Sequence, residues 1–347
     1  MKAFKPHLDS IAAYPYRKVE AAIKLDQNES PDDLPSSLKE RALERLRRLP
    51  WNRYPDLHAE GLRAAVARSQ GWPEAGVVVA PGSNVLVLAL AQAARQVVDT
   101  SPSFAYYRGG AQVAGVPYRG VRLAADFSLP VGGLLAAMTG EPGVAFLANP
   151  HAPTGRLFPE PEVRVLARHA AEAGWLLVVD EAYHQFSGSD FRTLAREGPS
   201  VALLRTFSKA FALGGIRAGY LLAAPEVAAR VQGMLPPFCV PAHTTAILET
   251  VLEAPEYAAV QAARLAAERG RVLAALAHHP SWRPHPSATN FFLLRTPDAG
   301  AAFDGLLARG ILVRRQDHLP GLEGCLRVSV GTEAENDAFL EAAFSLG

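Results

Sequence analysis

Lys209 is the residue whose surroundings in the sequence most clearly suit chemistry. It lies close to two hydroxyl side chains, Thr206 and Ser208, and Arg217 follows a short distance later. Upstream, an apolar run ends in an acid, Asp180. Pyridoxal phosphate requires an amine for a Schiff base, an acid for its ring nitrogen and ligands for its phosphate. The sequence supplies all three and therefore predicts this cofactor.

Asp180 is the predicted partner of the ring nitrogen. It ends the apolar run 176–180, and a buried carboxylate without a counter-charge costs several kcal/mol. A protonated pyridine provides that charge and stays protonated in return. The alternative is a helix-capping aspartate at a strand–helix turn. Tyr183, three residues later, is placed to hydrogen-bond the 3′-oxygen of the cofactor.

Two further features suit the phosphate and the ring of the cofactor. Gly82-Ser83-Asn84 precedes an apolar helical run, and free N–H groups at a helix start attract anions, although most such turns are only caps. Phe104 is a candidate to stack on the ring, although an aromatic residue that follows a strand is more often part of the core.

Arg327 stands within an apolar run, and a buried arginine needs an anionic partner. A substrate carboxylate matches its planar guanidinium. An internal salt bridge fits equally well. Arg314 lies in the preceding predicted strand and offers a second anion site.

Composition excludes several classes of protein. The chain has 347 residues, 49% of them apolar and 20% charged, and its net charge of +1 indicates neither a nucleic-acid partner nor a membrane surface. Its two cysteines, Cys239 and Cys325, have no metal-type spacing, so no metal is expected and a reducing cytoplasm is the simplest location. No apolar run approaches the ~20 residues that span a bilayer.

Apolar runs alternate with helical patterns in the first two thirds of the chain, which predicts an α/β fold with a mostly parallel sheet. After Pro236 the pattern changes to that of a smaller α+β domain. We predict an arm at 1–35, a helix at 36–50 that packs on the small domain, a large domain at 51–236 and a small domain at 237–347. Strands are expected at 77–79, 144–148, 176–180, 201–205 and 217–223, and a helix at 84–97.

Together these residues resemble the fold-type-I pyridoxal-phosphate aminotransferases, and the histidinol-phosphate aminotransferase family in particular. The resemblance covers nearly the whole chain, and its motifs lie at 25–31, 53–56, 149–155, 180–183, 206–219 and 326–332. The block around Lys209 is specific for the superfamily, whereas the first two motifs narrow it to the family. The resemblance implies a large domain with a seven-stranded sheet.

The resemblance also assigns roles to individual residues. Lys209 would form the Schiff base, Asp180 would pair with the ring nitrogen and Tyr183 would bond the 3′-oxygen. Five residues would hold the cofactor's phosphate: Ser83, Asn84, Thr206, Ser208 and Arg217. Tyr54 would reach the phosphate in the other subunit of a homodimer. Arg327 would bind the α-carboxylate of the substrate, and Tyr16, Asn28 and Arg314 its distal group. Ala152 departs from the family, in which many members have an asparagine that bonds the 3′-oxygen.

The implied reaction transfers the amino group of histidinol phosphate to 2-oxoglutarate, a step of histidine biosynthesis. A threonine-phosphate decarboxylase or an aminotransferase for aromatic or other amino acids is the nearest alternative. A DNA-binding regulator with this fold is disfavoured, because only about thirty residues precede the pattern and they contain no basic recognition helix.

Overall fold

The computed structural model describes residues 3, 5–11 and 18–346. The larger domain is built on one sheet, whose strand order is β2-β8-β7-β6-β5-β3-β4. Neighbouring strands are parallel except at β8, which is antiparallel to both β2 and β7. The strands are β2 (Val77–Ala80), β3 (Val97–Ser101), β4 (Tyr118–Arg122), β5 (Val144–Ala148), β6 (Leu176–Asp180), β7 (Val201–Thr206) and β8 (Gly219–Leu222). The predicted seven-stranded, mostly parallel sheet is confirmed.

Helices cover both faces of this sheet, which explains the continuous apolar strands. Side chains alternate across a strand, so Leu177 and Val179 of β6 enter one core while Val178 enters the other. The helices on the Val178 side are α3 (Ser83–Ala93), α4 (Ala105–Ala114) and α8 (Pro225–Gln232). Those on the other side are α2 (Glu60–Gln70), α5 (Val131–Ala137), α6 (Glu160–Ala173) and α7 (Arg192–Arg196).

Part of the sequence prediction for this domain was wrong. The helix expected at 84–97 ends at Ala93, and Val97–Ser101 is the buried strand β3. Two polar residues within β3, Asp99 and Thr100, break the apolar run, so that the strand was not recognised. The strand β4 was missed as well, because an edge strand with exposed arginines has no continuous apolar pattern.

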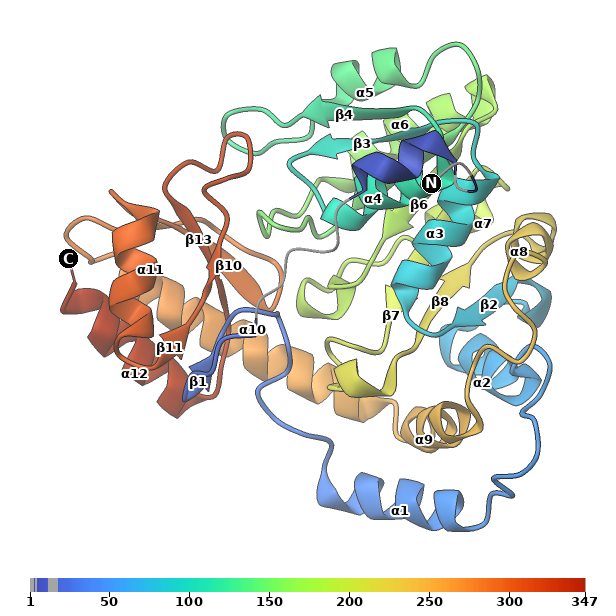
Figure 1. Ribbon diagram of the computed structural model, residues 1–347, viewed down its shortest axis with the longest axis horizontal. Helices are drawn as coiled ribbons and strands as arrows, with labels where there is room; N and C mark the ends of the chain where they lie inside the picture. The colour runs from blue at the N-terminus through green and yellow to red at the C-terminus, as the bar shows by residue number, and fades with distance from the viewer. Residues whose placement is uncertain (1–2, 4, 12–17, 347) are drawn as a thin grey trace.

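The smaller domain contains an antiparallel sheet of order β12-β13-β10-β9 with helices against it (Figure 1). Its strands are β9 (Arg283–Pro284), β10 (Phe291–Arg295), β12 (Arg314–Arg315) and β13 (Cys325–Ser329). Its helices are α11 (Ala299–Leu307) and α12 (Glu333–Phe344), the latter begun by a capping box between Thr332 and Glu335. The short strand β1 (Ile23–Lys24), from the N-terminal arm, pairs with β11 (Ile311–Leu312), so the arm joins this domain.

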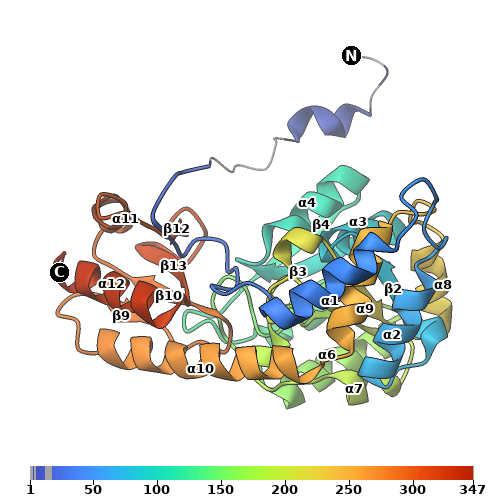
Figure 2. The ribbon, with the colours of Figure 1, turned by 90° about the horizontal axis from the view of Figure 1, so that it is seen from below.

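The long helix α10 (Glu256–Leu276) connects the two domains (Figure 2). It packs against α12 in the small domain and against the short helix His184–Phe186 in the large one. The predicted boundary at residue 236 falls between α8 and α9 (Ala242–Leu252). The helix α1 (Ser36–Arg47) packs on α9, which also contacts α2. Within the described residues, no helix is long and apolar enough to cross a membrane.

Candidate active site

The predicted catalytic residues meet at one edge of the large sheet. Asp180 is the last residue of β6, and Lys209 follows the end of the adjacent strand β7 by three residues. Ser83 begins α3, directly after β2. Ligands of open α/β sheets bind outside the carboxyl ends of the strands, where these residues lie.

Asp180 is buried, with 7% of its surface exposed. Its Oδ2 accepts a hydrogen bond from the Tyr107 hydroxyl at 2.6 Å, and its Oδ1 accepts one from the backbone N–H of Ala182 at 3.0 Å. Burial raises the pKa of Asp180 to about 6, although both hydrogen bonds act to lower it. No cation pairs with this carboxylate among the described side chains, so a protonated group bound beside Asp180 would supply the missing counter-charge.

Tyr107 is a site residue that the sequence prediction missed. It is fully buried in α4, stacks on Phe146 with ring centroids 4.7 Å apart, and meets the edge of Phe104 at 5.4 Å. It therefore connects the predicted ring-stacking residue, Phe104, to Asp180. A sequence signal was available, since Phe104 and Tyr107 are three residues apart at a helix start and so share one face.

The Lys209 amine is poised for proton transfer. Burial, together with the positive charges of Arg327 and Arg217, lowers the pKa of Lys209 to about 8, although the charge of Glu29 acts to raise it. The amine donates a hydrogen bond to the backbone oxygen of Gln27 at 3.1 Å and lies 5.9 Å from the centre of the Tyr183 ring. A substantial fraction of this lysine is consequently neutral slightly above neutral pH, as a base or nucleophile requires.

Tyr183 and Asn28 are neighbours, although 155 residues separate them in the chain. The Asn28 side chain donates a hydrogen bond to the Tyr183 hydroxyl oxygen at 3.0 Å, and the Tyr183 ring meets Phe291 edge-on at 5.1 Å. Both residues are buried. Asn28 thus lies beside the residue that was predicted to bond the 3′-oxygen; its predicted role at the distal group of the substrate stays a prediction.

An anion cradle forms around the start of α3. The Thr206 and Ser208 hydroxyls are 3.1 Å apart, and the Arg217 guanidinium lies 3.4 Å from Ser208. Gly82, at φ +95°, leaves space for this guanidinium, because a Cβ there would stand 2.5 Å from Arg217 Nη2. Ser83 and Asn84 form the first turn of α3, where free N–H groups favour an anion.

Two arginines of the small domain lie side by side on neighbouring strands. Arg314 of β12 stands opposite Arg327 of β13. Arg327 donates to the backbone oxygen of Asp26 at 2.6 Å, and its guanidinium lies 5.5 Å from the centre of the Phe291 ring. The charge of Arg327 lowers the pKa of Lys209, which places Arg327 near the amine.

Tyr54, another predicted residue, lies on the surface. Tyr54 is 84% exposed, with its ring 5.0 Å from that of Phe238, and Trp51 nearby in the chain is 89% exposed. Exposed aromatic rings of this kind are typical of protein interfaces. The predicted substrate residue Tyr16 lies outside the described residues.

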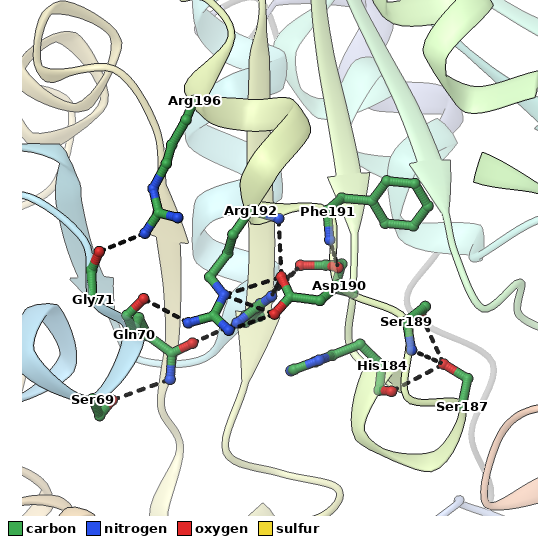
Figure 3. A network of polar contacts seen from close by, with 12 residues as sticks. Ser69, Gln70, Gly71, His184, Ser187, Ser189, Asp190, Phe191, Arg192 and Arg196 are labelled. Atoms are coloured by element: carbon green, nitrogen blue, oxygen red, sulfur yellow. Dashed lines mark hydrogen bonds and ion pairs between the residues drawn. The ribbon is translucent and has the colours of Figure 1, made fainter. Parts of the chain in front are cut away.

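A buried polar network fixes the segment that follows β6 (Figure 3). Glu181, next to Asp180, forms an ion pair with Arg205 at 2.7 Å, and Arg205 also pairs with Asp190 at 3.0 Å. Arg192 bonds Asp190 and the backbone oxygen of Gln70, which ties the segment to α2. Asp180 and Tyr183 therefore stand on a segment anchored on both sides, as a preorganised site requires.

These residues fit pyridoxal phosphate. The Asp180 carboxylate suits a protonated ring nitrogen, and the desolvated Lys209 amine suits the aldehyde. The Thr206 and Ser208 hydroxyls beside the Arg217 guanidinium suit a phosphate. In contrast, the described part of the chain contains no cluster of histidine, cysteine or acidic side chains that could hold a metal ion.

Comparison with known proteins identifies the family of this chain. Residues 20–342 match the family described as aminotransferase class I and II. The histidinol-phosphate aminotransferase of Deinococcus radiodurans is 49% identical over 97% of this chain and 94% of its own length. That of Thermococcus kodakarensis is 38% identical over 99% of this chain and 96% of its own.

Solved structures show the same architecture. The histidinol-phosphate aminotransferase of Sinorhizobium meliloti, in complex with pyridoxal 5′-phosphate, superposes with a TM-score of 0.89 and 26% identity, covering 100% of this chain and 98% of that one. The threonine-phosphate decarboxylase of Porphyromonas gingivalis shares the fold, with a TM-score of 0.81 and 23% identity over 92% of this chain and 98% of that one. The fold class expected from the resemblance is confirmed. The chain belongs to the class I and II aminotransferases and, within them, to the histidinol-phosphate aminotransferase family.

Proposed function

We propose that this chain transfers the amino group of histidinol phosphate to 2-oxoglutarate with pyridoxal phosphate as cofactor, a step of histidine biosynthesis. The observation that carries the proposal is the meeting of Lys209, Asp180 and the Arg217 cradle at one sheet edge. The family membership and the relatives' shared name support the reaction, and the complex from Sinorhizobium meliloti supports the cofactor.

Bound pyridoxal phosphate supplies an aldehyde that condenses with amines and a ring that withdraws electrons from the adjacent C–H bond. Lys209 provides the protein's amine for that condensation. With its pKa lowered to about 8, its neutral form would take the proton from the substrate Cα and return it, in a 1,3 shift, to the cofactor carbon on the other side of the imine nitrogen. The hydrogen bond to the Gln27 carbonyl oxygen holds the Lys209 amine against the N-terminal arm.

Asp180 holds a proton at the ring nitrogen. Its carboxylate is unpaired with any described cation, so a protonated pyridine gives it the counter-charge that burial demands. Tyr183 donates to the 3′-oxygen, and Phe104 stacks on the ring. Backbone and hydroxyl groups at Ser83, Asn84, Thr206 and Ser208, with Arg217, bind the phosphate.

Arg327 and Arg314 of the small domain bind different anionic groups of the two substrates. Arg327 binds the α-carboxylate of glutamate or 2-oxoglutarate through its planar guanidinium. Histidinol phosphate has no α-carboxylate, so its phosphate must supply much of its affinity. Arg314, opposite Arg327 on the next strand, binds that phosphate together with Tyr16.

We further propose a cytoplasmic homodimer. The exposed aromatic side chains Trp51, Tyr54 and Phe238 give the partner an apolar surface to cover. Tyr54 would then reach the cofactor phosphate of the other subunit. Cys239 and Cys325 are both free thiols, which suits a reducing compartment.

The test is a panel of amino donors assayed with 2-oxoglutarate, in which histidinol phosphate should give the highest kcat/KM. The Lys209→Ala variant should lose this activity while it still binds the cofactor. Release of carbon dioxide from threonine phosphate, or a higher kcat/KM for an aromatic amino acid, would contradict the proposed substrate.

A further inference from the structure

The arm segment of Asp26, Gln27 and Asn28 bridges the two domains through its own backbone. Its three successive carbonyl oxygens accept hydrogen bonds from Arg327 at 2.6 Å, Lys209 at 3.1 Å and Asn290 at 3.1 Å. The preceding residues pair with β11, so the small domain fixes where the segment lies. Two of these carbonyls therefore bond side chains of the site, Arg327 and Lys209.

The side chain of Asn28 is fixed in one orientation. Asn28 is 1% exposed, and its backbone N–H donates to the Ser329 hydroxyl oxygen at 2.8 Å. The Ser329 hydroxyl donates in turn to Oδ1 of Asn28 at 3.2 Å. Because Oδ1 faces Ser329, the amide N–H₂ faces Tyr183 and donates to its hydroxyl oxygen at 3.0 Å.

This contact determines the direction of the Tyr183 hydroxyl. Its oxygen accepts a hydrogen from Asn28, so its own O–H must point away from the amide. A phenol that accepts one hydrogen bond is also a stronger donor of the next, because the bonds of a chain polarise one another.

We propose that Asn28 is a positioning residue that orients the Tyr183 hydroxyl toward the 3′-oxygen of bound pyridoxal phosphate. The inference rests on the proposed function and gives Asn28 a role different from contact with the distal group of the substrate. The orientation of the Tyr183 hydroxyl affects the acidity of the cofactor's protonated imine. A stronger donor to the 3′-oxygen competes with the protonated imine nitrogen for that oxygen and thereby lowers the pH at which the visible band of the holoenzyme titrates.

Other groups that face Tyr183 must stay unchanged in such a test. Lys209 lies over its ring, and Tyr107 is close enough that Tyr183 helps to raise the pKa of Tyr107. Asn28 has φ +54°, a backbone conformation that asparagine, aspartate and glycine adopt more readily than other residues. Asn28→Asp keeps the size and the Ser329 contact but removes the donor, and Asn28→Gly removes the whole side chain.

The experiment is a spectral pH titration of the holoenzyme in four forms: unmodified, Asn28→Asp, Asn28→Gly and Ser30→Ala, the last a control for general disturbance of the arm. Asn28→Gly should raise the midpoint by roughly half a unit to one unit, as expected for loss of one hydrogen bond. Asn28→Asp should raise it at least as far, since its carboxylate adds a negative charge, and Ser30→Ala should leave it unchanged.

A Tyr183→Phe background separates a positioning role from a merely structural one. If Asn28 acts through Tyr183, then Asn28→Gly adds no further shift once the hydroxyl is gone. An equal shift in both backgrounds overturns the proposal. So does an unchanged midpoint accompanied by a raised KM for the phosphorylated substrate alone, which would return Asn28 to the distal group. An unmodified chain that forms no visible band with pyridoxal phosphate overturns the proposed function itself.

Discussion

Asp99 carries a large and measurable electrostatic penalty. It lies in the middle of the buried strand β3, is 1% exposed, and accepts a hydrogen bond from the Tyr118 hydroxyl at 2.7 Å. Burial raises the pKa of Asp99 from 3.8 to about 8, and neither Tyr118 nor the charge of Arg108 offsets it. At neutral pH the native protein therefore keeps Asp99 mostly protonated, whereas the unfolded chain ionises it.

The pH dependence of this penalty follows from the direction of the shift. A raised pKa means that the folded state binds the proton more tightly, so stability is full below 3.8 and falls as the pH rises toward 8. Each unit of that range costs about 1.4 kcal/mol, which amounts to roughly 4 kcal/mol at pH 7. Asparagine has the shape of a protonated aspartate and no charge to lose.

Asp99→Asn should therefore stabilise the protein, by an amount that grows with pH. We expect little difference from the unmodified protein near pH 4 and roughly 4 kcal/mol near pH 7, measured by urea unfolding of the apoprotein across that range. The exposed residue Asp304 provides the matched control, since Asp304→Asn should not reproduce the trend. A stability difference that stays constant with pH would refute the reasoning, because only a titrating group makes it change.

Three further predictions concern the site and its support. Arg314→Ala should raise KM for histidinol phosphate by roughly 10- to 100-fold, the value of a charge-assisted hydrogen bond, and should raise KM for glutamate much less. Equal effects on both KM values would contradict the assignment of the phosphate to Arg314 and of the α-carboxylate to Arg327. Tyr107→Phe should raise the pKa of Asp180 in the apoprotein by about one unit, because the lost bond stabilises the ionised carboxylate. Carboxyl NMR with Asp180→Asn as the assignment control measures it, and an unmoved resonance would exclude this influence. Glu181→Gln should destabilise the protein by roughly 3 kcal/mol in urea unfolding, since it removes one partner of the buried Arg205. A loss under about 1 kcal/mol would mean that Asp190 alone suffices.

The sequence predictions were most accurate for strands whose buried positions are all apolar. The strands 144–148 and 176–180 were predicted to the residue, because both of their faces are covered and every position is apolar until the final acid. The strand β3 failed for the opposite reason, since Asp99 and Thr100 are buried polar residues inside it. Nothing local distinguishes such a strand from the end of the preceding apolar helix.

The candidate site was predictable where chemistry demands a residue type at the end of an element. Asp180 ends one strand and Lys209 follows the next, and the structure places both at the same sheet edge. The hydrogen bond from Tyr107 to Asp180 spans 73 residues, and that from Asn28 to Tyr183 spans 155. These contacts depend on how helices and the arm pack on the sheet, which no pattern along the chain records.

The arm segment at residues 26–28 illustrates the limit most clearly, because its contribution is made by backbone. Arg327 and Lys209 bond carbonyl oxygens of Asp26 and Gln27, and any residue type supplies the same oxygens. The segment must therefore act through its path, which β1 fixes by pairing with β11. An incoming carboxylate then meets a guanidinium that one hydrogen bond already orients, so less freedom is lost on binding than with a mobile arginine. A change that disrupts the pairing of β1 with β11 should consequently weaken carboxylate binding, even though every side chain of the site remains.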